Sequence, residues 1–144
     1  MKIIEDGELG SAMKSNIDLA DIVFDASVDP NTFDMLSLVR LCPDEKRMSV
    51  ALLHSKVSVG RDLAGKMAGR EKSAIYITGN SLKTLTLFGI SEDDVVGWLK
   101  AVLTETMKAA VIEKIIVDGE SGVGVAAMKV AADLGMPTDG FSRK

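Results

Sequence analysis

The chain has 144 residues, of which 47% are hydrophobic and 26% are charged, a composition typical of globular proteins and not of disordered ones. Its length suits one domain that spans residues 1–144. The formal net charge of −4 argues against nucleic acid as a partner, because binding along a phosphate backbone needs a basic surface.

The sequence also argues against a membrane partner and against secretion. No apolar run reaches the ~20 residues that a membrane-spanning helix needs. The first residues, MKIIEDGELG, lack the apolar core and the cleavage site of a secretory signal. The single cysteine, Cys42, excludes an internal disulfide and fits a reducing compartment. We therefore expect a cytoplasmic protein.

The first half of the chain predicts alternating strands and helices. β-Branched and aromatic residues predict a strand at 22–28, after which Asp29 and Pro30 suit the cap and first position of a helix. The nearly continuous apolar run at 48–55 predicts a strand that is buried on both faces. Apolar residues four apart then predict a helix that ends at Gly69.

The second half continues this alternation. Residues 73–80 predict a strand, and residues 82–89 suit either a short helix or a strand, of which we favour the helix. Ser91 can cap the clearest helix, which has three acids in its first turn and an apolar face anchored by Trp98. Residues 114–119 predict a further strand, and an alanine-rich helix follows it.

This order predicts one α/β domain of three layers, Rossmann-like, with four or five mostly parallel strands and helices on both faces. In such sheets, ligands gather beyond the carboxyl ends of the strands. The loops that follow the strands are therefore the candidate binding segments.

A glycine-rich turn follows the strand at 114–119. Its backbone N–H groups, together with the start of the next helix, could hold a phosphate. The residues predicted to contact the ligand are Asp118, Gly119, Ser121, Gly122 and Gly124. The spacing matches neither the Walker pattern nor the dinucleotide fingerprint. Two interpretations stay open, a binding loop and a turn that only packs a helix closely against a strand.

The segment IIVDGESGVGVAAMKVAADLGMPTDGFSRK resembles the nucleotide-binding motif of the lysine-decarboxylase-like and molybdenum-cofactor-carrier-like Rossmann families. The resemblance implies that Gly119, Ser121, Gly122 and Gly124 form the phosphate loop. It also implies a second turn at Gly135, Pro137 and Gly140 that ends in the basic residues Arg143 or Lys144. Here the motif lies near the C-terminus and carries acids at Asp118 and Glu120, unlike the usual motif of those families.

A second candidate turn, ITGNSLKTL, follows the strand at 73–80. Gly79, Asn80 and Ser81 could offer backbone and side-chain donors to a ligand. The stretch resembles the Thr-Gly-Asn-x-x-Lys turn of nucleoside-triphosphate pyrophosphatases of the inosine-triphosphatase type. The alternative is a helix start that Asn80 or Ser81 caps.

The third candidate segment follows the strand at 48–55. His54, Ser55 and Lys56 form a local group of polar and basic side chains. His54 is the only histidine, and so the only side chain whose ordinary pKa lies near neutrality. A structural role for these residues is the alternative.

The remaining chemistry-bearing residues give weaker signals. We expect Asp25 to point to the surface and Cys42 to be a buried apolar residue. No set of side chains has the spacing of a metal site, so we expect no metal, and no nucleophile or cofactor is identified.

Two functions follow as hypotheses. The first is a small protein that binds a nucleotide or another phosphorylated ligand at the strand ends, whether or not it is an enzyme. The second is a non-enzymatic homo-oligomeric subunit or regulatory module, whose contact would use the Trp98 face of the helix at 91–110.

Overall fold

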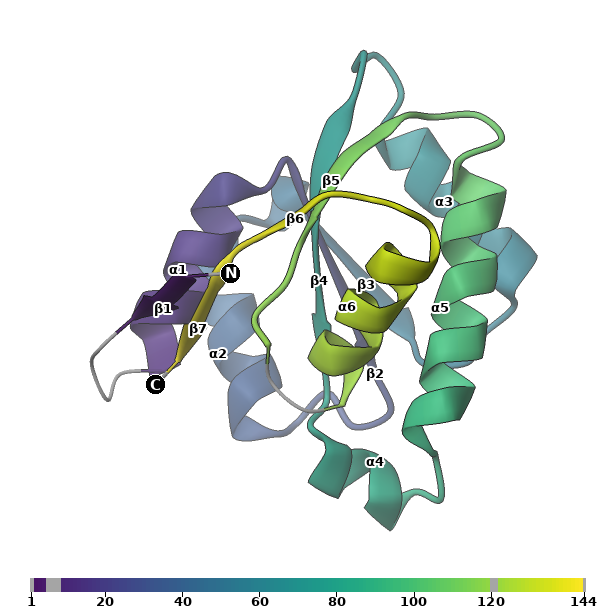
Figure 1. Ribbon diagram of the computed structural model, residues 1–144. Helices are drawn as coiled ribbons and strands as arrows, with labels where there is room; N and C mark the ends of the chain where they lie inside the picture. Colours follow the sequence, from purple (N-terminus) through teal and green to yellow (C-terminus); the bar gives the residue numbers. More distant parts are fainter. Residues whose placement is uncertain (1, 5–8, 120–121, 144) are drawn as a thin grey trace.

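The computed structural model describes residues 2–4, 9–119 and 122–143 (Figure 1). Its strands are β1 (Lys2–Ile4), β2 (Ile22–Ser27), β3 (Arg47–Ala51), β4 (Ser73–Gly79), β5 (Ile112–Ile116), β6 (Thr138–Asp139) and β7 (Phe141–Arg143). Its helices are α1 (Leu9–Leu19), α2 (Phe33–Leu41), α3 (Lys56–Lys66), α4 (Leu82–Leu87), α5 (Glu92–Thr106) and α6 (Val123–Asp133), with a short 3₁₀ turn at Asp44–Lys46. In the described part of the chain, no helix is both long and apolar enough to span a bilayer.

Five strands form one parallel sheet in the order β3-β2-β4-β5-β6, and β1 and β7 form a separate parallel pair. The chain runs from β2 outward to β3 and then returns past β2 to reach β4. Counted from β2, the strand order is 2-1-3-4-5, which is a doubly wound order with its reversal between the first and third strands. The predicted parallel α/β architecture is confirmed.

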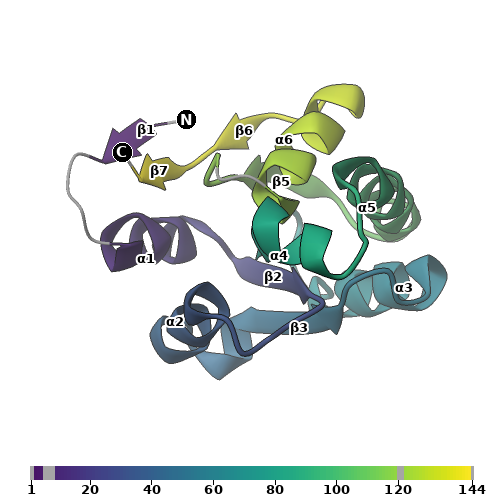
Figure 2. The same ribbon diagram turned by 90° about the horizontal axis from the view of Figure 1, so that it is seen from below.

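Helices cover both faces of this sheet, as Figure 2 shows from the end where the parallel strands finish. The helices α1 and α2 lie on one side of the sheet, and α3, α5 and α6 lie on the other. Alternate residues of each strand face opposite layers. In β2, Phe24 joins the cluster under α3, α5 and α6, whereas Val23 joins the cluster under α1 and α2.

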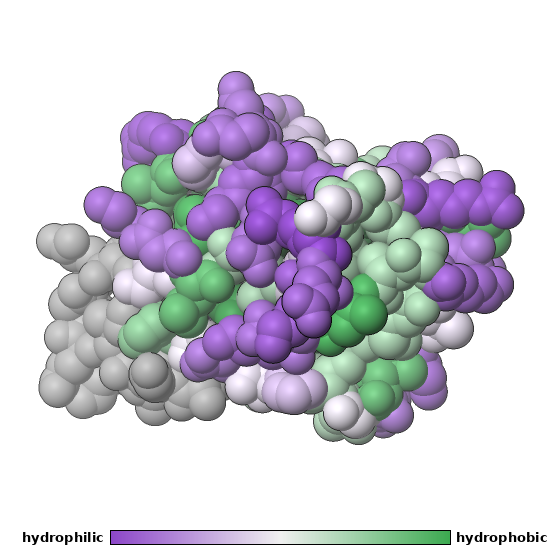
Figure 3. Space-filling model, turned by 90° about the horizontal axis from the view of Figure 1, so that it is seen from above, coloured by the Kyte–Doolittle hydropathy of each residue, from purple (hydrophilic) through white to green (hydrophobic). Residues whose placement is uncertain are grey.

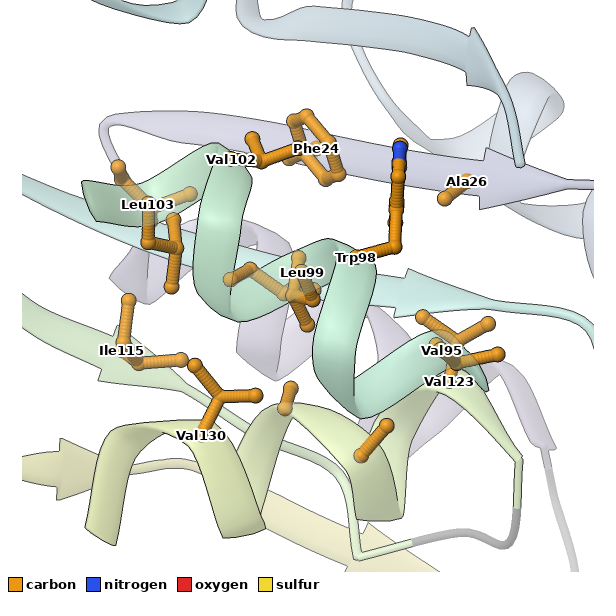
Figure 4. Close-up of a cluster of buried hydrophobic side chains, with 14 of the residues drawn as sticks. Phe24, Ala26, Val95, Trp98, Leu99, Val102, Leu103, Ile115, Val123 and Val130 are labelled. Carbon is orange, nitrogen blue, oxygen red and sulfur yellow. The ribbon is translucent and has the colours of Figure 1, made fainter. Parts of the chain in front are cut away.

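The two apolar clusters are unequal. The cluster on the α3, α5 and α6 side contains most of the buried apolar side chains of the described residues, including the apolar face of α5. Figure 4 shows Trp98 beside Phe24 in this cluster, with a ring-centroid distance of 6.2 Å. The cluster on the α1 and α2 side is far smaller, and Tyr76 is its largest side chain.

The burial of Trp98 corrects one expectation. Its side chain is only 7% exposed, and its ring N–H donates to the carbonyl oxygen of His54 at 2.6 Å. The Trp98 face of α5 packs against the sheet of its own chain, so this face is not free to contact a second copy. A homo-oligomer therefore stays a prediction that needs another surface.

Several predicted elements are confirmed with sharper boundaries. The strands at β2 and β4 match their predicted ranges within one residue, and residues 82–87 form a helix with Ser81 as its N-cap. Ser91 caps α5 and forms a reciprocal capping box with Asp94. The helix ends at Thr106, four residues earlier than predicted. Cys42 is buried, as expected.

Two predictions about the first half of the chain are wrong. The helix α2 begins at Phe33 with Thr32 as its N-cap, because Asp29 instead accepts a hydrogen bond from the Asn31 N–H in a preceding turn. The strand β3 is an edge strand with exposed residues, and is not buried on both faces. An apolar run alone does not distinguish a central strand from an edge strand that is covered on one face.

Candidate functional site

The strand order places a candidate site at the carboxyl ends of β2 and β4. In open parallel sheets, ligands bind outside these ends at the point where the strand order reverses. Figure 2 looks onto this end of the sheet, with α4 in front of it. Three loops that are distant in the sequence meet here, namely 28–32, 80–81 and the described part of 117–122.

Asn80 ties the loop after β2 to the end of β4. Its side-chain oxygen accepts hydrogen bonds from the backbone N–H groups of Val28 at 2.7 Å and Asp29 at 3.1 Å, and its amide group donates to the Asp29 carbonyl oxygen at 2.9 Å. The side chain is buried. A direct ligand contact by the Asn80 side chain, as predicted, would therefore compete with bonds that hold two loops together. Ser81 has the structural role that was the alternative, since it caps α4 by accepting from the Thr84 N–H at 3.4 Å.

The glycine turn before α6 packs directly on the end of β4. Gly122 has φ +85°, and a Cβ atom at this position would overlap the carbonyl oxygen of Asn80. The Val123 N–H donates to the same oxygen at 3.2 Å. Gly79 is equally close to its neighbours, because its missing Cβ would overlap the Ala26 carbonyl oxygen. The structure thus brings together two of the three predicted segments, and Gly122 and Gly79 are needed for backbone contact.

Asp118 lies between these segments. One of its carboxylate oxygens, Oδ2, accepts hydrogen bonds from the hydroxyls of Tyr76 and Thr78, both at 3.1 Å. The other, Oδ1, lies against Gly124 in the first turn of α6, where a Cβ atom would overlap it. Negative charge is favourable at a helix N-terminus. The chain's own carboxylate therefore lies at the helix start that the sequence suggested for a phosphate.

The other residues of the glycine turn are described in part. Gly119 has φ +72°, a conformation that favours glycine. Gly122 is the N-cap of α6 and provides no side-chain hydrogen bond to the helix. Ser121, a predicted ligand contact, lies outside the described residues.

Four polar side chains form a row across the α1 and α2 face of the sheet, close to its carboxyl end. Asp25 on β2 is paired in register with Ser49 on β3 and with Thr78 on β4. Asp118 continues the row, since it accepts the Thr78 hydrogen bond and follows β5. We call Ser49, Asp25, Thr78 and Asp118 the polar row.

Asp25 is the buried acid of this row, which corrects the expectation of a surface position. Its side chain is 6% exposed, and its Oδ2 accepts a hydrogen bond from the Ser49 hydroxyl at 2.6 Å. Burial raises the pKa of Asp25, while the Ser49 hydrogen bond and the charge of Arg47 oppose that rise. Its second oxygen, Oδ1, has no hydrogen-bond partner among the described residues. A buried carboxylate with an unused acceptor is the kind of group that occurs at functional sites.

Tyr76 and Asn16 support the inner side of the polar row. Burial, followed by the charge of Asp118, raises the pKa of Tyr76 well above its ordinary value, so its hydroxyl stays a donor. Asn16 on α1 exchanges two hydrogen bonds with the backbone of Phe141, at 2.7 and 2.9 Å. Because the Asn16 side chain also lies beside the Tyr76 hydroxyl, the row borders this partly buried contact between α1 and β7.

The third predicted segment lies apart from the other two. His54, Ser55 and Lys56 follow the edge strand β3, which is three strand spacings, or about 14 Å, from β5. Ser55 is the N-cap of α3 and accepts from the Ser58 N–H at 3.4 Å. The His54 backbone holds the Trp98 ring, and the His54 and Lys56 residues are exposed. The structure does not bring these residues together with the glycine turn.

Sequence reasoning missed most of the polar row. Of its members, Ser49 and Thr78 were not predicted as site residues, and Asp25 was expected at the surface. The neighbouring Tyr76 and Asn16 were not predicted either. A signal was present in IVFDAS, because an acid in the middle of an apolar strand is rarely buried without a partner. Its partners, however, depend on strand order and register.

No protein-family model, curated protein or solved structure gives a significant match to this chain. The resemblance of the C-terminal segment to nucleotide-binding Rossmann motifs stays a prediction. Any functional assignment therefore rests on the geometry of the carboxyl end of the sheet.

The contact between Gly122 and Asn80 predicts an asymmetry between two glycines. Gly122→Ala and Gly135→Ala both place a side chain at positive φ, which is unfavourable by about 1–2 kcal/mol. Only Gly122 also faces backbone atoms, whereas a Cβ at Gly135 meets open space. We expect Gly122→Ala to lower the free energy of unfolding by a further ~1–3 kcal/mol. Urea unfolding measures both losses, and equal losses would contradict the close contact.

The raised pKa of Asp25 predicts a pH-dependent gain in stability for Asp25→Asn. When the folded-state pKa of an acid is raised, ionisation disfavours the folded state, and this loss is complete once the pH exceeds the folded-state pKa. Relative to the native chain, the variant should gain stability as the pH rises from about 4 to 8.

Thermal unfolding from pH 4 to pH 8 measures this difference. The exposed Asp62→Asn on α3 removes one charge elsewhere and controls for net charge. A stability difference that does not change with pH would show that ionised Asp25 does not disfavour the fold.

Proposed function

We propose that this chain binds a small ligand that carries both hydroxyl and phosphate groups, a nucleotide or a sugar phosphate, at the carboxyl ends of β2, β4 and β5. The observation that supports this most is the polar row at the point of strand-order reversal. Two of its four members are carboxylates, and the buried one, Asp25, has an oxygen without a hydrogen-bond partner among the described residues. Buried acids in that position are unfavourable for folding alone, which favours a role in binding.

The carboxylates of the polar row favour a ligand whose hydroxyl groups face the row. Carboxylates accept hydrogen bonds, and an acid near the end of a strand is the usual partner of ribose hydroxyls in doubly wound folds. Asp118 is partly exposed and Asp25 offers its free oxygen. A phosphate in the same place would be repelled by both carboxylates. In the proposed complex the sugar lies toward Asp118 and Asp25, and the phosphate lies farther out.

The outer position has few cations in the described residues that could hold the phosphate. Lys83 on α4 is exposed near this end, and the first-turn N–H groups of α6 lie beside Asp118. A divalent ion between the phosphate and Asp118 would relieve the repulsion, because Mg²⁺ binds carboxylate and phosphate oxygens together. The proposal therefore includes tighter binding in the presence of magnesium.

The test uses ribose 5-phosphate and adenosine 5′-monophosphate, each with and without Mg²⁺. A ligand present at 100 times its Kd should stabilise the fold by about 2.7 kcal/mol, which raises Tm by several degrees in a domain of this size. We expect such a shift with both compounds. The 2′,3′-dideoxy form of the nucleotide should give a much smaller shift, because the row then has no hydroxyls to bind.

Asp25→Asn and Asp62→Asn form the matched pair of variants for this test. Both remove one carboxylate and keep the side-chain shape, but only Asp25 belongs to the polar row. The ligand-induced shift should fall in Asp25→Asn and stay unchanged in Asp62→Asn. If neither sugar phosphate nor nucleotide shifts Tm, or if the dideoxy form binds equally well, the proposal fails.

Self-association is a second candidate function, supported by a different surface. On α2, Phe33, Leu36 and Val39 are exposed, with Phe33 at 70%, and their spacing of three places them along one side of the helix. The neighbouring strand β3 is a sheet edge whose outer backbone groups pair with no strand among the described residues. Exposed apolar stripes and open edges are features of protein contact sites.

Leu36→Glu tests this candidate. A charge in the middle of the α2 stripe should convert an oligomer to a monomer in sedimentation velocity, because a buried unpaired carboxylate disfavours the contact. Leu87→Glu on α4 is the control, since Leu87 is also highly exposed but lies on another helix. A native chain that sediments as a monomer would remove this candidate.

A further inference from the structure

A groove of about 490 Å³ lies between the C-terminal ends of α3 and α5, at the opposite end of the sheet from the polar row. We call it the α3–α5 groove. Small and apolar residues line it and form what we call its floor, namely Ala64, Gly65, Met67, Ala68, Gly69, Ala109 and Ala110. Arg61, Arg70, Lys108 and Glu105 form its charged rim. Figure 3 looks onto this end of the molecule, where hydrophilic residues lie beside paler and apolar ones.

The rim has a surplus of positive charge on a chain with a net charge of −4. Its three cationic side chains and the one carboxylate of Glu105 give a formal charge of +2. This charge becomes +1 when Asp21, which lies beside Arg70, is included. Arg61 lies 3.8 Å from Glu105 and its side chain is 76% exposed, so its guanidinium is free to contact a further anion. The Arg70 contact with Asp21, at 3.5 Å, is also long.

Glu105 is the central residue of this rim. Its carboxylate accepts from the Lys108 ammonium at 2.7 Å through Oε2 and faces Arg61 through Oε1. The hydrogen bond with Lys108 is the main reason that the pKa of Glu105 is lowered, so the carboxylate is ionised at neutral pH. Its Cβ packs against Gly60, where α3 and α5 cross closely. Glu105 is therefore fixed between two cations and competes with any anion that approaches them.

Cations at helix C-terminal ends also stabilise the helices themselves. That role does not require an open groove, and it explains neither the floor of small residues nor the volume. A concave site of this size with an apolar floor and a few charged groups is typical of small-molecule sites. The floor suits a flat apolar body, and the positive rim suits an anionic group attached to it.

We infer that the α3–α5 groove binds a small organic anion with a flat apolar body, separately from the ligand of the carboxyl end. The apolar body lies on the floor of alanines and glycines, and the anionic group lies between Arg61 and Lys108. Glu105 weakens this binding by pairing with the same two cations.

The probe is naphthalene-1-sulfonate, and its binding is followed by NMR of the ¹⁵N-labelled full chain. Saturable shifts should appear at the amides of Gly65, Gly69, Ala109 and Ala110, which line the groove. The uncharged analogue 1-naphthalenemethanol has the same apolar body and should bind more weakly. Raising the salt concentration should weaken the binding of the sulfonate but not that of the uncharged analogue, because salt screens exposed charges.

Three variants that each remove one charge of the rim test the inference in opposite directions. Arg61→Gln and Lys108→Gln should each raise the Kd of the sulfonate about two- to fivefold, the range of an exposed ion pair. Glu105→Gln should lower that Kd by a similar factor, since it releases both cations. A merely structural ion-pair cluster would not give these opposite signs. The Kd of the uncharged analogue should be the same in all three variants.

Several results would overturn the inference. The first is the absence of saturable shifts, and the second is a set of shifts at the carboxyl ends of the strands. Equal binding of the uncharged analogue would show that the rim does not recognise charge. A rise in Kd with Glu105→Gln would show that this carboxylate supports binding and does not oppose it.

Discussion

The contact between the start of α6 and the end of β4 is the constraint on which the carboxyl-end site depends. Gly122 approaches the backbone of Asn80 so closely that no side chain fits between them. Asn80 in turn fixes the loop after β2 through three hydrogen bonds. The ends of β2 and β4 and the start of α6 are thereby held together by the Asn80 side chain and by close backbone contact, and the polar row lies next to this rigid frame.

The same contact between α6 and β4 also fixes the position of Asp118. Its carboxylate receives two hydroxyl hydrogen bonds from β4 and lies against Gly124 at the start of α6. The helix dipole and the hydroxyls both favour its negative charge. Asp25, two strands away, has weaker support, from the Ser49 hydroxyl and the charge of Arg47, and burial outweighs it. The two acids on this face of the sheet therefore differ in environment. The surroundings of Asp118 favour its ionised form, whereas burial disfavours the ionised form of Asp25.

Local signals in the sequence predicted the elements well. Ser91 with the acids after it defined the start of α5, and the run at 73–80 defined β4. The glycine turn was correctly placed before a helix, but its contact with Asn80 was not predictable. That contact requires β4 and β5 to be neighbours, and strand order is set by packing across the whole sheet.

The errors have the same physical origin. Asp25 looked exposed because a single sequence does not show which strands flank β2. Trp98 looked available to a partner because a broad apolar helix face suits a sheet and a second subunit equally well. His54 and the glycine turn both follow strands, yet the order β3-β2-β4-β5 places two strands between theirs. Residue types identified the candidates, and only the topology determined which of them meet.

The unequal size of the two apolar clusters has a consequence for how the molecule opens. Regions with less buried apolar surface unfold locally at lower free energy than the rest of a domain. The layer of α1 and α2 covers the smaller cluster, and the polar row lies on that same face of the sheet. Backbone amides of α1 and α2 should therefore exchange with solvent through partial openings that leave the layer of α3, α5 and α6 intact. The same openings would further expose the Asp25 carboxylate, which lies on this face of the sheet.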